Sequence, residues 1–252
     1  SVIPVRNIYY MLSYAFQILQ EQGYRNITTE NFDNIAELYS AILSKGISIQ
    51  LKRVLNREYL EVNEPLSAIR GKIDLSDSVK TRSIMKAQLV CSYDEFSENS
   101  YFNRILKTTV MLLLKTDISK SRKKELKNLM MFFKDVDTLD VYNIDWHIRY
   151  NKNNRSYHLL LSICNLVIEG VLKTQQDGTT KLINFIDEQR MCRLYEKFIL
   201  EYYRKHYPFV SANSEQIPWQ LDDGKSDMLP VMQSDIMLRK ENQILIIDAK
   251  YY

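Results

Sequence analysis

The sequence predicts an α+β protein: a mostly helical N-terminal domain with a small antiparallel sheet, then a domain of mixed strands and helices. Apolar residues recur at helical spacing over most of the first two thirds of the chain. Short alternating segments interrupt this spacing between residues 59 and 93. From about residue 180 the order becomes strand, helix, strand, strand. A soft change in composition divides the chain into domains 1–173 and 174–252.

The bulk composition is ordinary for a globular protein of 252 residues, with 45% hydrophobic and 26% charged residues. The net charge of +3 does not decide between nucleic-acid and protein partners. The sequence has no apolar run as long as a membrane span and no signal-peptide pattern, so we expect a soluble cytoplasmic protein without a membrane partner. Cys91, Cys164 and Cys192 form no Cys-x-x-Cys pair, and we expect small buried side chains in a reducing compartment.

The N-terminal domain opens with a helix whose apolar stripe includes Ile8, Leu12 and Leu19. A second helix follows Thr28-Thr29, a plausible cap, and extends past Gly46. Besides this second helix, which runs from after Thr29 towards Arg53, the predicted helices are Asn7–Gln20, Asn99–Leu114, Lys120–Phe133 and Tyr157–Leu172. The predicted strands are Tyr59–Val62, Ile69–Leu75 and Ala87–Tyr93.

The C-terminal domain begins with a short apolar strand, Leu182–Ile186. A long helix follows from Asp187 to His206, and acidic residues at its start and basic residues at its end suit the helix dipole. A loop containing Pro218 and Pro230 leads to a hairpin that begins at Ser234.

The hairpin brings two acidic residues together if its turn consists of Glu241 and Asn242. Residue 240 then lies opposite residue 243, and Asp235 lies opposite Asp248 on the same face. Lys250 shares that face because side chains alternate along a strand. The other face collects an apolar set: Ile236, Leu238, Leu245 and Ile247.

Two opposed carboxylates repel each other, and a bound Mg²⁺ would remove that repulsion. A nearby lysine could orient the attacking water or stabilise charge on a phosphate. Asp235, Asp248 and Lys250 therefore predict metal-assisted phosphodiester hydrolysis, with the two aspartates as metal ligands. The opposing interpretation is two surface acids beside an edge lysine, because Glu-Asn fits a tight turn poorly and a shift of one residue would separate the acids.

Glu196, within the last long helix, is a possible accessory acid, and an exposed helical glutamate is the equal alternative. The three histidines are isolated, and we interpret them as structural. The sequence has no Gly-x-x-x-x-Gly-Lys-Ser/Thr loop, so we expect no nucleotide to bind this chain by that route.

The N-terminal segment from Val2 to Ala15, VIPVRNIYYMLSYA, resembles the opening signature of the McrC family. The resemblance continues through Ile69–Ile73 and Tyr93–Lys107, the latter including Asn103-Arg104, and ends in the two segments around Asp235 and Asp248. It covers essentially the whole chain. McrC is the nuclease subunit of the McrBC 5-methylcytosine-dependent restriction system.

This resemblance implies a restriction-endonuclease-like PD-(D/E)xK core, with Asp235, Asp248 and Lys250 as the catalytic set and Mg²⁺, or alternatively Mn²⁺, as the cofactor. Glu196 matches a less constant family position. The resemblance also implies a partner, a McrB-like AAA+ GTPase hexamer, and a substrate, double-stranded DNA containing modified cytosine. Residues 1–173 would dock to the ring and stimulate its GTP hydrolysis.

One departure concerns the end of the sequence. Family members continue well past the strand that carries Asp248 and Lys250, so we expect an incomplete nuclease core that is weak or inactive by itself. Two alternatives stay open. The chain could be a catalytically silent adaptor that activates the GTPase ring, or the nuclease subunit of a sequence-specific LlaJI-type system.

Overall fold

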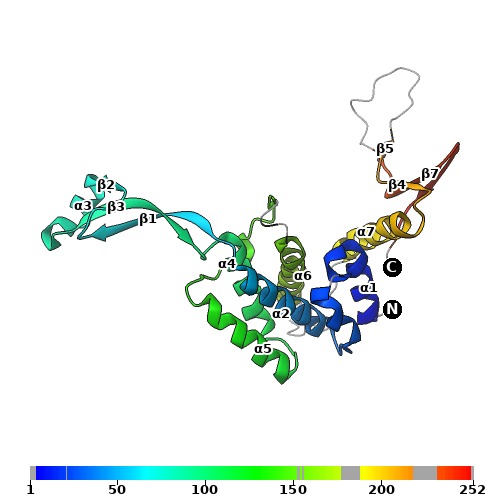
Figure 1. Cartoon of the computed structure of the whole chain (residues 1–252), viewed down its shortest axis with the longest axis horizontal. Coiled ribbons are helices and arrows are strands. Elements are labelled where there is room, and N and C mark those ends of the chain that lie inside the picture. The colour runs from blue at the N-terminus through cyan, green and yellow to red at the C-terminus, as the bar shows by residue number, and fades with distance from the viewer. Residues whose placement is uncertain are drawn as a thin grey trace, which may run out of the picture.

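The computed structural model describes residues 4–20, 22–151, 154, 156–176, 188–217 and 232–250. Within these residues the fold is α+β, with seven α-helices and two three-stranded antiparallel sheets, as expected. Figure 1 shows a helical body, an arm that projects from it, and a C-terminal sheet beside the last helix. No described helix is long and apolar enough to cross a membrane.

The helical body is built around α6, which packs against α2 and α4, while α5 packs against α2. Its helices are α1 (Val5–Ala15), α2 (Ile35–Arg53), α4 (Tyr101–Leu113), α5 (Lys120–Met130) and α6 (Tyr157–Gln176). Short 3-10 helices join them: η1 (Gln17–Gln20), η2 (Gln22–Thr29), η4 (Met131–Phe133) and η5 (Val141–Asn143).

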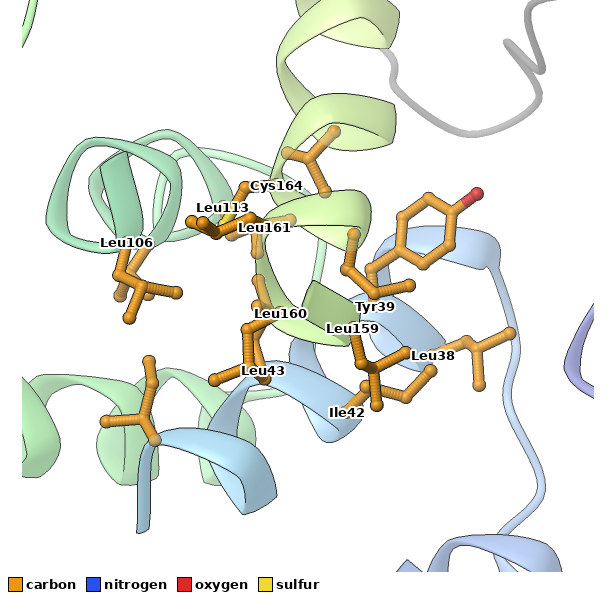
Figure 2. Close-up of a cluster of buried hydrophobic side chains, with 14 of the residues drawn as sticks. Leu38, Tyr39, Ile42, Leu43, Leu106, Leu113, Leu159, Leu160, Leu161 and Cys164 are labelled. Atoms are coloured by element: carbon orange, nitrogen blue, oxygen red, sulfur yellow. The ribbon is translucent and has the colours of Figure 1, made fainter. Parts of the chain in front are cut away.

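The core of the body lies where α2, α4 and α6 meet (Figure 2). Leucine side chains from all three helices are fully buried there, including Leu43, Leu106 and Leu160. Gly46 allows the close approach of α2 and α6, because a Cβ atom at this position would lie 2.1 Å from a Leu160 methyl carbon. The burial of this apolar surface is the main stabilising term of the fold.

The largest differences from the predicted helices are at the end of α1 and the start of α2. The first helix ends at Ala15, and the expected continuation to Gln20 forms the 3-10 helix η1. The apolar stripe is still buried, since Ile8, Leu12 and Leu19 are at most 1% exposed. The second helix is capped by Asn34, whose side chain accepts a hydrogen bond from the Glu37 amide at 2.9 Å. Thr28 and Thr29 belong instead to η2.

The arm is formed by the antiparallel pair β1 (Glu58–Leu66) and β3 (Leu89–Ser97), which correspond to two of the predicted strands. Strand β2 (Lys72–Asp74) pairs with the other edge of β3 and is shorter than the predicted strand Ile69–Leu75. Helix α3 (Leu75–Lys80) and η3 (Ser83–Lys86) complete its outer end. Strands of this length carry that end about 30 Å from the body.

The outer end of the arm is held by small polar side chains. Ser78 is fully buried, and its hydroxyl donates to the Asp74 carbonyl and accepts from the Val90 amide at 2.7 Å. Gly71 has a φ of 70°, and a Cβ there would lie 2.3 Å from the Ser92 carbonyl oxygen. These contacts give the end of the arm a defined shape without a large apolar core.

A buried amide fixes the base of the arm to the body. The Asn103 side chain, on α4, donates to the carbonyl oxygens of Asn56 and Glu98, each at 2.8 Å. Asn56 lies just before β1 and Glu98 just after β3, so both are at the base of the arm. The Tyr157 hydroxyl donates to the Asn103 side chain and accepts from the Asn56 amide. Asn103 lies in a segment that resembles McrC. Its side chain thus holds together the two points at which the chain enters and leaves the arm.

The C-terminal part consists of α7 (Glu188–His206), the sheet β4 (Ser211–Asn213), β7 (Ile236–Lys240) and β8 (Gln243–Ile247), and the pair β5 (Gln216–Ile217) and β6 (Met232–Gln233). Helix α7 packs against α1 and against this sheet. Its residues Met191 and Leu194 belong to the main core, whereas Ile199 and Tyr203 contact a second small cluster under the sheet.

Some predictions lie outside the described residues, namely the strand Leu182–Ile186 and the loop that contains Pro218 and Pro230. The division into domains 1–173 and 174–252 stays a prediction; residue 173 falls in the last turn of α6. The cysteine prediction is confirmed for Cys91 and Cys164, which are buried, whereas Cys192 is partly exposed.

Candidate functional site

The predicted register of the C-terminal hairpin is confirmed. Ile236 lies opposite Ile247, and Lys240 lies opposite Gln243. Glu241 adopts a φ of 53°, so the two-residue turn forms despite a sequence that suits it poorly. Ile236 and Leu238 are buried under the sheet and Ile247 is partly buried, but the fourth member of the predicted apolar face, Leu245, is 58% exposed.

Asp235 directly precedes Ile236 and Asp248 directly follows Ile247, so both aspartates lie just beyond the last pair of this register. The Asp235 carboxylate accepts a hydrogen bond from the Ala249 amide at 2.8 Å, which fixes it across the end of the hairpin. The Lys250 ammonium lies 3.0 Å from the Asp248 carboxylate. The structure therefore brings the three predicted residues together, with Lys250 59% and Asp248 65% exposed.

The ion pair with Lys250 holds the pKa of Asp248 below its ordinary value, and an interaction with the Asp235 carboxyl group acts in the same direction. Asp248 is therefore a carboxylate at neutral pH. Because Asp248 and Lys250 are exposed to solvent, their ion pair contributes little to stability. Replacing this ion pair by contacts with a ligand would therefore cost little stability.

Glu196, on α7, is within electrostatic range of the same site. Burial raises the pKa of Glu196, and the negative charges of Asp235 and Asp248 raise it further, while Arg193 and Lys250 oppose this. Glu196 is thus close enough to sense both aspartates. This proximity distinguishes it from an ordinary exposed helical glutamate, although it does not establish a role.

The donor set suits Mg²⁺ in one particular way. In the described ranges, no three His, Cys, Asp or Glu side chains converge closely enough to enclose a metal ion. Mg²⁺ is usually held by one or two carboxylates, with water and substrate phosphate oxygens completing its octahedron. Asp235 and Asp248 match that pattern, so the residues fit a metal ion shared with a phosphodiester substrate.

Two contacts at this site could not be read from sequence spacing. The bond from the Ala249 amide to Asp235 depends on how the chain leaves β8. The position of Glu196 depends on the packing of α7 against the sheet, where the Arg204 guanidinium donates to the Ala212 carbonyl at 2.9 Å. Both arise from tertiary structure. Of the three histidines, His206 has a structural contact, since it lies 2.7 Å from the Tyr14 hydroxyl, between α7 and α1. His147 is exposed and lies 2.8 Å from the Asp145 carboxylate.

Comparison with known proteins decides the family. Residues 5–252 match the family described as McrBC 5-methylcytosine restriction system component. The type IV methyl-directed restriction enzyme EcoKMcrBC of Escherichia coli K12 is 30% identical over 259 residues, a match that covers 100% of this chain and 74% of that protein. The chain belongs to the McrC family. The resemblance of its opening segment and its two acidic segments is thereby confirmed at the level of the family.

Solved structures agree with this fold. The McrC-family chain superposes on a chain of the Thermococcus gammatolerans assembly of McrB AAA+ hexamers with bound McrC, with a TM-score of 0.58 and 18% identity over 99% of its length. A second McrBC complex from the same organism gives a TM-score of 0.52 and 19% identity over 80% of this chain. The chain spans 56% and 58% of those two solved chains.

Proposed function

We propose that this McrC-family chain is the nuclease subunit of a modification-dependent type IV restriction complex. Asp235, Asp248 and Lys250 form the proposed catalytic site for DNA cleavage. The observation that carries the proposal is the convergence of two carboxylates and a lysine at one end of the hairpin. The family relationship supplies the substrate class, double-stranded DNA containing modified cytosine. A PD-(D/E)xK core is the architecture proposed for residues 174–252.

In this mechanism Asp235 and Asp248 hold Mg²⁺, with Mn²⁺ as the alternative. The metal supplies a Lewis acid for the scissile phosphate and lowers the pKa of bound water. Lys250 lies beside Asp248, and with the metal bound its ammonium would be placed to stabilise negative charge on the phosphate or to orient the attacking water. Glu196 is a proposed accessory acid that holds or receives a proton beside the aspartates.

We further propose that the arm docks the chain to a McrB-like AAA+ GTPase hexamer. The related Thermococcus protein is seen bound to McrB hexamers. The outer end of the arm lies away from the body (Figure 1). Its exposed apolar residues are Ile69, Leu75, Val79, Ile84 and Met85, which are 50–84% exposed. Clustered exposed apolar groups on a defined structure are typical of protein interfaces.

The arm proposal predicts that Val79→Ser combined with Met85→Ser weakens binding to the ring about 30-fold, since two interface anchors of this kind contribute about 2 kcal/mol. Stimulation of GTP hydrolysis falls in parallel. Both side chains are at least 64% exposed, so the fold is retained. Met131→Ser is the matched control, because Met131 is 67% exposed on the body. Equal binding by the arm variant and the control would reject the arm as the docking element.

A combined assay separates the candidate functions. The chain is mixed with a cognate McrB-like GTPase ring, methylated plasmid, GTP and Mg²⁺, and both GTP hydrolysis and DNA cleavage are measured. The nuclease proposal expects stimulated hydrolysis together with cleavage. Stimulation without cleavage would identify a silent adaptor, and cleavage that does not depend on methylation would indicate a LlaJI-type system.

A further inference from the structure

A pocket of about 340 Å³ lies between α1, α6, α7 and the segment that contains Trp146 and Tyr150. It is separate from the hairpin site, although α7 borders both. Its volume falls at the lower end of the range found for small-molecule sites. The pocket therefore has room for one planar ring and a linked polar group.

Aromatic rings form one side of this pocket. His158 contacts Tyr150 with ring centroids 4.7 Å apart, and it contacts Phe16 at 5.4 Å. Trp146 lies partly buried against the core at the same pocket. Rings in such edge-to-face arrangements leave faces on which a further ring can stack. The chemistry of this wall suits a planar aromatic ligand.

Two cations line the pocket from α7. Arg193 and Lys197 are four residues apart, so they lie side by side on one face of the helix. The Lys197 ammonium lies 4.4 Å from the centre of the Phe16 ring, and burial lowers its pKa. None of the described residues that line the pocket is acidic. The two cations therefore favour an anionic group beside the aromatic wall.

We propose that this pocket binds one unstacked nucleotide of the DNA strand, with its base on the aromatic wall and its phosphate on Arg193 and Lys197. Stacking on aromatic side chains together with cationic contacts to the backbone is the general mode of single-strand binding. The inference rests on the proposed nuclease function, because that function brings DNA to α7.

The position of the pocket supports this ligand over other aromatic anions. Arg193 and Glu196 are three residues apart on α7, so they are neighbours on the surface of one helix. The charges of Asp235 and Asp248 in turn raise the pKa of Glu196. A phosphate on Arg193 would therefore belong to a strand that passes close to the metal site. The pocket would hold a nucleotide near the cleaved bond and fix the position of the strand.

Trp146 fluorescence tests this proposal directly. The chain carries Trp219→Phe so that Trp146 is its remaining tryptophan, and a short single-stranded oligodeoxynucleotide is added in the presence of EDTA. We expect quenching by the single strand and weaker quenching by a hairpin duplex of the same composition. Lys197→Met and Arg193→Met should each weaken the single-strand affinity about 10-fold, since each removes a charge-assisted contact.

Lys124→Met, on the exposed surface of α5, is the matched control and should leave the affinity unchanged. Absence of quenching, or quenching that neither Lys197→Met nor Arg193→Met weakens, would overturn the proposal. The titration requires no metal, so it is independent of cleavage. Cleavage by the chain with its GTPase ring but no quenching would reject the pocket alone. Quenching without cleavage in that combined assay would reject the nuclease function and leave nucleotide binding in place.

Discussion

Asp248→Asn is expected to reduce DNA cleavage by the complete restriction assembly about 100-fold or more, because it removes one of two carboxylates that would hold the metal. A metal ion stabilises the charge of the transition state by several kcal/mol, and each 1.36 kcal/mol changes the rate tenfold. Asparagine has the same shape, and the ion pair that it removes is solvent-exposed. The fold and the stimulation of GTP hydrolysis should therefore persist.

Glu241→Gln provides the control for this experiment, since it removes one exposed carboxylate from the other end of the same hairpin. Cleavage by that variant should equal that of the unmodified chain. Asp235→Asn tests the second ligand, because its amide oxygen can still accept the bond from Ala249 while the charge is lost. Full cleavage by Asp248→Asn would show that the chemistry lies elsewhere.

Asn103→Ala is expected to lower the free energy of unfolding by roughly 2–4 kcal/mol, as measured by urea denaturation. The substitution leaves the carbonyl oxygens of Asn56 and Glu98 and the Tyr157 hydroxyl without the partner they share. Asn103 is fully buried, so water from the solvent does not reach these groups to replace the lost hydrogen bonds. The loss should be larger than that of a surface substitution.

The same variant should also weaken docking to the GTPase ring, because Asn103 holds together the segments that enter and leave the arm at its base. Asn128→Ala, on the exposed face of α5, is the control and should change stability by no more than about 0.5 kcal/mol. If Asn103→Ala and Asn128→Ala unfold at the same urea concentration, the buried amide does not support the arm as described.

The sequence was sufficient to predict the hairpin and its two acids. Strand alternation and a two-residue turn determine which residues face each other, and the structure reproduces that register. The exposure of Leu245 was not predictable in this way, because it depends on what covers the sheet. The sequence of the hairpin itself determines which residues pair, whereas the rest of the fold determines which of its side chains are buried.

The arm shows the same limit. Its strands could be predicted from β-type segments near Tyr59 and Tyr93, but their projection from the body could not. That projection depends on long-range contacts of Asn103 with residues on both sides of the arm. Similarly, Asn34 caps α2 because its side chain reaches the Glu37 amide, while two threonines upstream offered an equally good local signal.

At the candidate site, spacing identified Asp235, Asp248 and Lys250 because they lie on one supersecondary unit. Glu196 could be suggested from its place in the helix only with an exposed glutamate as the equal alternative, since its approach to the aspartates requires α7 to pack against the sheet. The pocket beside Arg193 and Lys197 gave no sequence signal, because its walls come from four separate segments.

A calorimetric titration with Mg²⁺, and with Mn²⁺ in parallel, tests the central claim most directly. The account predicts that the unmodified chain binds a divalent ion, and that Asp235→Asn and Asp248→Asn each weaken this binding about 10-fold or more. Glu241→Gln should bind as the unmodified chain does. Equal affinity in all four proteins, or no binding in the presence of a non-cleavable DNA duplex, would contradict a metal site at the end of the hairpin.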